Sequence, residues 1–145
     1  MPFGGEISAF DAAFPRFLIS TGAAGLMLLI AVTTYVLLTP WKELSLVRNG
    51  NTAAGVALGG AIIGLAIPIS STLASSMTLP GLFIWGAIAL LMQLIAYRVV
   101  DLILRDIPGR IANDEIGAAT VLVAAKLSAA MILAAGLWDP VLQRL

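Results

Sequence analysis

The chain has 145 residues, of which 60% are hydrophobic and only 11% are charged, and its mean hydropathy is +1.03. Soluble domains are about half apolar and about a quarter charged, and disordered chains are less apolar still, so this composition predicts an integral membrane protein. Eight basic residues balance eight acidic ones, which argues against a nucleic-acid partner. The chain contains no His and no Cys, so we expect no enzyme activity, no catalytic residues, no metal and no cofactor.

Four apolar stretches are long enough to cross a bilayer as helices, which requires roughly 20 residues each. The sequence therefore predicts an all-α integral membrane protein with four transmembrane helices in one membrane domain covering residues 1–145. The predicted spans are Phe17–Leu38, Thr52–Leu73, Leu79–Val100 and Ile116–Leu137.

The distribution of basic residues predicts the orientation of these spans, because short cytoplasmic loops carry an excess of Lys and Arg. The loop after the first span carries Lys42 and Arg48, and the segment from the end of the third span into the fourth carries Arg98, Arg105 and Arg110. The opposite side carries only Arg16 and Arg144. This difference predicts an N-out/C-out topology. Aromatic residues at both edges are expected to act as interfacial anchors: Tyr35, Trp41 and Tyr97 at the cytoplasmic edge, and Trp85 and Trp138 at the outer edge.

The segment before the first span has apolar residues on one helical face. Phe3, Ile7, Phe10 and Phe14 are spaced by four, three and four residues. We predict a short interfacial helix over residues 1–14 that ends at Pro15. A disordered tail is the alternative.

The two halves of the chain show a weak internal repeat at an offset of 64 residues. Asn49-Gly50-Asn51 aligns with Asn113-Asp114-Glu115, and Gly64 aligns with Ser128. This pattern predicts two tandem helical hairpins, one over about 15–75 and one over about 79–139. Chance alignment of Ala-rich helices is the alternative.

One block of residues resembles the bacterial "domain of unknown function 350" family. The block comprises Tyr35, Thr39-Pro40, Glu43-Leu44, Asn49-Gly50-Asn51 and Ala53-Ala54, and Gln93 also fits the family. The resemblance implies a small four-span protein of the bacterial cytoplasmic (inner) membrane, and it implies no particular activity. Members are often encoded beside envelope-stress or polyamine-related genes, which implies a role in envelope maintenance or stress. The chain departs from the repeat at Asp114-Glu115 and at Lys126, which aligns with Ile62.

Small residues recur along the second predicted span. Gly55 and Gly59 are four residues apart, as are Gly60 and Gly64. This spacing lets helices pack closely in lipid, so we predict a tightly packed hairpin or dimer face. Lining of a pore is the alternative. Pro68 interrupts the same span, and Ser70, Ser71 or Thr72 could bond to the carbonyl that it leaves free.

Lys126 lies near the middle of the fourth span, where a charged side chain is costly and often functional. Gln93 falls at a similar depth, and Thr33 and Thr34 lie slightly shallower, so we predict an intramembrane polar cluster of these four residues. No carboxylate is expected at that depth. A site for an ion or a lipid headgroup is one interpretation, and an adventitious charge tolerated by hydrogen bonds is the other.

The block of residues that resembles the family is expected in the cytoplasm, and helix capping and turn formation can explain its residues. Asn51 is placed to cap the second span, Gly50 allows a tight turn, and Thr39-Pro40 ends the first span. A ligand or partner site at these residues is the alternative.

Two functions from different classes remain. The first is a non-catalytic membrane component that forms a homo-oligomer, or joins other membrane proteins, through Gly/Ala-rich faces. The second is an oligomeric channel or carrier for ions or small solutes, with Lys126 and Gln93 in its pathway.

Overall fold

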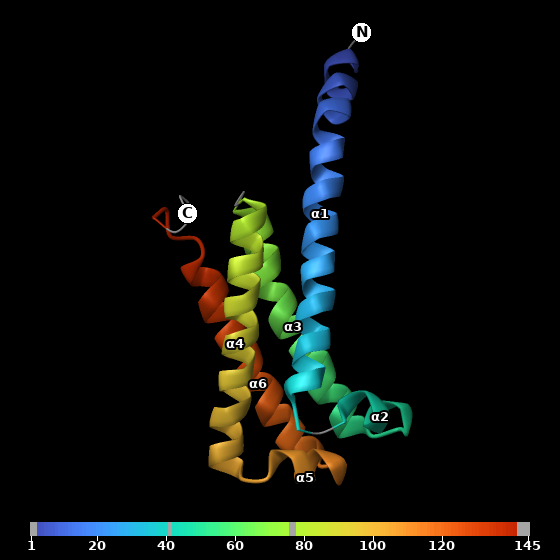
Figure 1. The fold of residues 1–145 in the computed structure, drawn as a ribbon, viewed down its shortest axis with the longest axis vertical. Helices are drawn as coiled ribbons and strands as arrows, with labels where there is room; N and C mark the ends of the chain where they lie inside the picture. The colour runs from blue at the N-terminus through green and yellow to red at the C-terminus, as the bar shows by residue number, and fades with distance from the viewer. Residues whose placement is uncertain (1–2, 41, 76–77, 142–145) are drawn as a thin grey trace.

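A computed structural model describes residues 3–40, 42–75 and 78–141, and within these residues all regular structure is helical. The described residues form four long and two short helices. Figure 1 shows the long helices running side by side, with the short helices lying across one end. The helices are α1 (Gly4–Leu38), α2 (Glu43–Arg48), α3 (Thr52–Ala74), α4 (Leu79–Leu104), α5 (Ile107–Ala112) and α6 (Ile116–Gly136).

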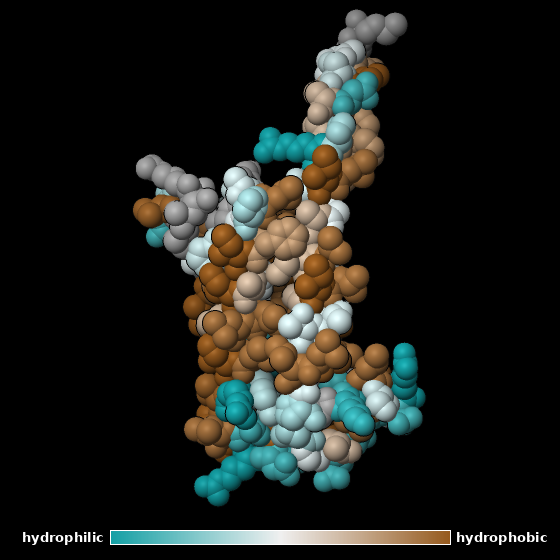
Figure 2. Space-filling view, viewed as in Figure 1, coloured by the Kyte–Doolittle hydropathy of each residue, from teal (hydrophilic) through white to brown (hydrophobic). Residues whose placement is uncertain are grey.

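The four predicted spans are confirmed as membrane-length helices. By length and composition α1, α3, α4 and α6 could each cross a membrane. Helices α3, α4 and α6 begin at the residues that the sequence predicted, Thr52, Leu79 and Ile116. Figure 2 shows an apolar surface around the middle of these helices and a hydrophilic surface at the end formed by α2 and α5. The protein is therefore an all-helical, multi-span membrane protein.

The prediction that a separate helix ends at Pro15 is wrong. Helix α1 runs without a break from Gly4 to Leu38 and contains Pro15. A proline inside a helix removes one backbone hydrogen bond and leaves the carbonyl four residues earlier without its helical partner. Residues 3–19 are exposed, so this carbonyl at Asp11 is not sealed inside protein and the helix can continue. In Figure 1 the first part of α1 extends beyond the other helices.

Helix α3 is central to the bundle and packs most extensively against α6, and also against α4 and α1. Its small residues explain this position. Ala53, Ala57 and Ala61 are fully buried, and a methyl group added at Gly60 would lie 2.4 Å from the Val123 side chain of α6. Close packing by small residues is therefore used inside this chain.

The chain turns twice in the same way, at positions 64 residues apart. Helix α2 covers residues 43–48 and α5 covers 107–112, and the following long helices begin at Thr52 and Ile116. The turns contain Gly50 (φ +85°) and Asp114 (φ +59°), which both have left-handed backbone conformations. In each turn the residue before the long helix donates its backbone N–H to the carbonyl five residues earlier: Asn51 to Leu46 at 2.9 Å, and Glu115 to Arg110 at 3.0 Å.

Candidate functional site

The most unusual side chain in the bundle is that of Lys126, which lies in α6 and is 0% exposed. Its Nζ donates a hydrogen bond to the hydroxyl oxygen of Tyr35 on α1 and lies 4.2 Å from the centre of the Tyr35 ring. Tyr35 is itself 0% exposed. An amine in lipid needs such a polar partner, because an unsatisfied buried charge costs several kcal/mol.

Gln93 of α4 joins three helices at the same level. Its Nε2 donates to the carbonyl of Lys126 at 3.1 Å and to the carbonyl of Gly64 at 3.3 Å. Gly64 is four residues before Pro68, which has no N–H to donate, so Gln93 bonds to the carbonyl that the proline leaves free. A methyl group added at Gly64 would lie 2.7 Å from the end of the Gln93 side chain, so a larger residue there would force the Gln93 amide to move.

The prediction that Ser70, Ser71 or Thr72 bonds to this carbonyl is wrong. The Thr72 hydroxyl donates to the carbonyl of Pro68 at 2.9 Å, and the Ser70 hydroxyl donates to that of Ile67 at 2.8 Å. Side-chain hydroxyls in helices reach back three or four residues, and Gly64 is too far before them in the chain.

A carboxyl group also belongs to this region, contrary to the expectation that no carboxylate shares the surroundings of Lys126. Glu43 on α2 is 0% exposed and interacts electrostatically with both Lys126 and Tyr35. Helix α2 packs against α3, which brings a residue from the loop into the buried part of the bundle. Sequence position alone placed Glu43 outside the span, and the packing of α2 reverses that placement.

Thr33 and Thr34 do not join the cluster. Thr33 is exposed and Thr34 half-buried. Their hydroxyls donate to the carbonyls of Leu29 and Ile30 on the same helix, at 2.8 Å each. Depth along a span does not fix which way a side chain faces. The structure therefore brings together Lys126, Gln93, Tyr35 and Glu43, which we call the buried polar cluster.

The block of residues that carries the family resemblance has structural roles. The side chain of Asn51 caps α3 by accepting from the backbone N–H of Ala54 at 2.8 Å, which confirms its predicted capping role. Its Nδ2 also donates to the carbonyls of Ile111 and Ala112, at 2.9 and 3.1 Å, at the end of α5. Asp114 accepts from the backbone N–H of Ala53 at 2.8 Å. Asn51 and Asp114 thus connect the two turns.

The remaining residues of the block lie around this connection. Thr39 is buried, and its hydroxyl donates to the carbonyl of Tyr35 at 3.1 Å, where α1 ends. Pro40, Asn49 and Gly50 are exposed.

The prediction that Tyr35 and Tyr97 are interfacial anchors is wrong, because both side chains are buried in the bundle. Trp85 is half-buried and Trp138 is exposed, while Trp41 lies outside the described residues. Sequence reasoning thus missed Tyr35 and Glu43 as members of the buried polar cluster. Both lie in the block that carries the family resemblance, and that signal could have identified them.

In the described part of the chain no three acidic side chains gather as a group that could hold a metal ion. The buried polar cluster offers an amine, a phenol, an amide and a carboxyl group. Gln93 Oε1 accepts no hydrogen bond from any described residue. This arrangement can hold or exchange a proton, or interact with an ion, within the apolar part of the bundle.

Known proteins with similar sequences agree with this description. The model of the family described as Domain of Unknown Function (DUF350) matches residues 9–137. The UPF0719 inner membrane protein YjfL of Escherichia coli strain K12 is 34% identical over 109 residues, which cover 75% of this chain and 83% of that protein. The UPF0719 transmembrane protein YshE of Bacillus subtilis strain 168 is 26% identical over 116 residues, covering 79% of this chain and 87% of that protein. No solved structure matches the chain. With four membrane-length helices and a family match over most of its length, the chain belongs to the DUF350 family and is a multi-span protein of the inner membrane.

Proposed function

We propose that this protein is a non-catalytic membrane component that assembles into a homo-oligomer or with other membrane proteins, in the maintenance of the envelope or its response to stress. The observation that carries the proposal is a row of apolar side chains along the first half of α1. Phe3, Ile7, Phe10, Phe14 and Phe17 are between 40% and 66% exposed. The rings of Phe10 and Phe14 stack with centroids 4.9 Å apart, and those of Phe14 and Phe17 lie 6.3 Å apart.

The length of α1 explains why this row needs a partner. With 35 residues, α1 is about 52 Å long, against about 30 Å for the hydrocarbon core of a bilayer. Part of α1 therefore extends beyond the hydrocarbon, where exposed aromatic rings are costly. Contiguous apolar surface of this kind is typical of an interaction site.

A second surface for assembly lies on α3. No described side chain or neighbouring helix comes within 4 Å of a methyl group built at Gly55 or Gly59, in contrast to Gly60 and Gly64. Small residues four apart on an open helix face allow another helix to approach closely. This surface supports assembly through the remaining small residues of α3.

Adjacent glycines provide a matched test. We expect Gly59→Leu to leave the monomer folded and to reduce oligomer size, since its side chain projects into open space. Gly60→Leu should unfold the monomer, because it collides with Val123. Phe10→Ser/Phe14→Ser should also reduce oligomer size. Oligomer mass is measured by light scattering in detergent and by crosslinking in membranes. Unchanged mass in both surface variants, with helical content intact, would contradict the proposal.

We further propose that the ends of the bundle face opposite sides of the membrane as the basic residues predict, with α2 and α5 in the cytoplasm and the N-terminus outside. Arg48, Arg105 and Arg110 lie in or beside α2 and α5, at the end opposite to the start of α1 (Figure 1). Because the chain has no Cys, single S8C and S45C variants can be labelled without background. A membrane-impermeant maleimide added to intact spheroplasts should label S8C and spare S45C. The reverse pattern would overturn this orientation.

The matching turns support the proposal that the chain consists of two tandem hairpins. The bounds of α2 and α5, the starts of α3 and α6, the left-handed turn residues and the backbone hydrogen bonds recur at an offset of 64 residues. Exchange of one turn for the other tests this proposal. Residues 49–51 are replaced by Asn-Asp-Glu, the sequence of the second turn. This change removes the cap that Asn51 provides, but helical content should stay the same if the two turns have equivalent backbones.

The buried polar cluster favours a second candidate function, an oligomeric channel or carrier for ions or small solutes. Lys126 is fully buried, and Gln93 Oε1 has no donor among the described residues. Intramembrane ionisable groups commonly mark ion or proton pathways. A four-helix chain would need several copies to enclose a pore, so this candidate also requires assembly.

Ion flux separates the two candidates. The protein is reconstituted in liposomes, and flux under an applied potential is compared for the wild type, Lys126→Leu and the exposed control Lys42→Leu. Flux that only Lys126→Leu abolishes, with oligomer size unchanged, supports a channel or carrier. No flux in any of the three, in vesicles with verified folding and orientation, supports the assembly function alone.

A further inference from the structure

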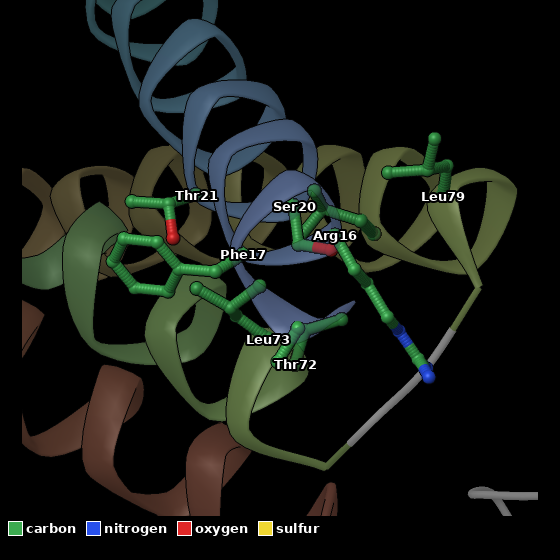
Figure 3. Close-up of a pocket in the computed structure, with 9 residues that line it drawn as sticks. Arg16, Phe17, Ser20, Thr21, Thr72, Leu73 and Leu79 are labelled. Atoms are coloured by element: carbon green, nitrogen blue, oxygen red, sulfur yellow. The ribbon is translucent and has the colours of Figure 1, made fainter. Parts of the chain in front are cut away.

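A cleft of about 420 Å³ lies between α1, α3 and α4 at the end of the bundle opposite to α2 and α5. In Figure 3, Phe17 and Ser20 of α1 lie beside Thr72 and Leu73 of α3. The Arg16 side chain extends away from Phe17, and Leu79 of α4 lies on the same side of the view as Arg16. Ala13, Thr21 and Leu82 complete the lining. The cleft is separate from the buried polar cluster.

The polar groups of this cleft are available to a ligand. Arg16 forms no hydrogen bond or ion pair with any residue in the described ranges, and neither hydroxyl of Ser20 or Thr21 bonds to a described group. Most helical hydroxyls elsewhere in this chain behave differently. Those of Thr33, Thr34 and Thr72, for example, donate to a carbonyl four residues earlier. A guanidinium and two hydroxyls that bond to none of the described residues thus line the α1 side of one cavity.

The cleft lies where the spans end. Helix α3 ends at Ala74 and α4 begins at Leu79. Because both helices have the length of a membrane span, we expect these ends to lie near the boundary of the hydrocarbon region. Phe17, Leu73 and Leu82 give the cleft an apolar side next to its polar groups. This combination matches the boundary between the phosphate and the acyl chains of a phospholipid. Arginine binds phosphate through two parallel hydrogen bonds, and pockets of this kind between membrane helices bind lipid headgroups.

We propose that this cleft binds an anionic phospholipid, with Arg16 on the phosphate, Ser20 and Thr21 donating hydrogen bonds to headgroup oxygens, and an acyl chain against Phe17 and Leu73. The occupant is a lipid rather than a water-soluble anion because the cleft is amphipathic and opens at the level where lipid headgroups lie. The site does not depend on the assembly proposed above, since all of its residues belong to one chain.

Native mass spectrometry of the full chain tests this site. The protein in detergent is titrated with phosphatidylglycerol and, separately, with phosphatidylcholine. We expect preferential retention of phosphatidylglycerol and about a tenfold loss of retention in Arg16→Gln, the usual effect of removing a charge-assisted hydrogen bond. Arg105→Gln, which removes an exposed arginine at the opposite end of the bundle, should retain the lipid as the wild type does.

A second variant and a competitor identify the role of the cleft itself. Ser20→Leu keeps the charge of Arg16 but fills the cavity, and we expect it to reduce lipid retention while helical content and thermal stability stay unchanged. Inorganic phosphate at the lipid concentration should not displace the lipid. Equal losses in Arg16→Gln and Arg105→Gln, retention unaffected by both cleft variants, or displacement by inorganic phosphate would each overturn the proposal.

Discussion

The two turns between long helices have matching backbones and different side chains. The turn from α2 to α3 and the turn from α5 to α6 each follow a helix of six residues, and they share a backbone hydrogen bond and one left-handed residue at an offset of 64. The two turns differ in the side chain that is buried at the first residue of the short helix, which is charged in one and apolar in the other. Glu43 begins α2 and Ile107 begins α5, and both are 0% exposed.

This difference shows that the backbone of the turn does not depend on the buried side chain. The shape is set by the left-handed residue and the helix starts, which both turns share. The charges are distributed unequally as well, because Lys126 in the second half corresponds to Ile62 in the first, which is 38% exposed. The backbone is therefore matched at the two turns, whereas the buried polar cluster draws its side chains from α1, α2, α4 and α6.

The largest expected effect comes from giving each half the apolar residue of the other. We expect Glu43→Ile and Lys126→Ile each to lower the free energy of unfolding by about 3 kcal/mol, because each leaves the other charge buried without compensation. The double variant should be less destabilised than the sum of the two by about 1–3 kcal/mol. Thermal unfolding in detergent measures these changes, and exposed Lys42→Ile serves as a control. Strict additivity would show that Glu43 does not stabilise Lys126.

The next effect concerns Asp114, which connects the second turn to α3. Asp114→Ala loses the cap on Ala53 and places alanine in a left-handed conformation, so we expect a loss of about 2 kcal/mol. Asp114→Gly removes the same cap without the strain and should lose about 1 kcal/mol. Chemical denaturation of both variants separates the two contributions. Equal losses would mean that backbone strain at this position is negligible.

Gly50 provides the corresponding measurement in the first turn. Its φ is +85°, and the described residues leave open space around it, so Gly50→Ala introduces backbone strain without a collision. We expect a loss of about 1 kcal/mol, measured by the same denaturation. Gly59→Ala, in an ordinary helical conformation with open space around it, should be neutral or slightly stabilising. A neutral Gly50→Ala variant would contradict the requirement for a left-handed conformation here.

The smallest expected effect is the pH dependence of the stability that the Arg110–Glu115 ion pair contributes in the second turn. The corresponding residues of the first turn are Leu46 and Asn51, which carry no charge. Arg110 Nε and Nη2 lie 2.7 and 2.5 Å from the two carboxylate oxygens of Glu115, and these hydrogen bonds hold the pKa of the Glu115 carboxyl below its usual value. A lowered pKa in the folded state contributes stability above the unfolded-state pKa, and this contribution is lost as the pH falls through the folded-state pKa. We therefore expect the melting temperatures of the wild type and Glu115→Gln to converge as the pH falls from about 5 to below about 4.3, the ordinary pKa of a glutamate. A constant difference over this range would exclude the pair as its source.

The sequence predicted the spans well because their signal is local. Runs of apolar residues, Asn51 as a cap and Lys126 as an intramembrane charge can each be identified without knowledge of the fold. The partners of Lys126 could not be predicted in this way. Tyr35 is 91 residues away in the chain, and Glu43 becomes buried only when α2 packs against α3.

Two prolines illustrate the same limit. Pro15 was expected to end a helix, but the surrounding exposed backbone tolerates it. Pro68 was expected to be compensated by nearby hydroxyls, but Gln93 of another helix bonds to the freed carbonyl. A proline specifies that one hydrogen bond is missing, whereas the tertiary structure determines what replaces it.

The bond from Gln93 to Gly64 has a consequence for biogenesis. When the ribosome has delivered only α1 to α3 to the membrane, the carbonyl of Gly64 has no donor from Pro68 and α4 has not yet been made. An unsatisfied carbonyl in hydrocarbon costs several kcal/mol, so a chain that contains only α1 to α3 is less stable in the bilayer than the complete bundle. Arrival of α4 supplies the missing donor, and docking of α6 then gives Gln93 its second acceptor. A product truncated before Gln93 would therefore lack the donor that satisfies the Gly64 carbonyl.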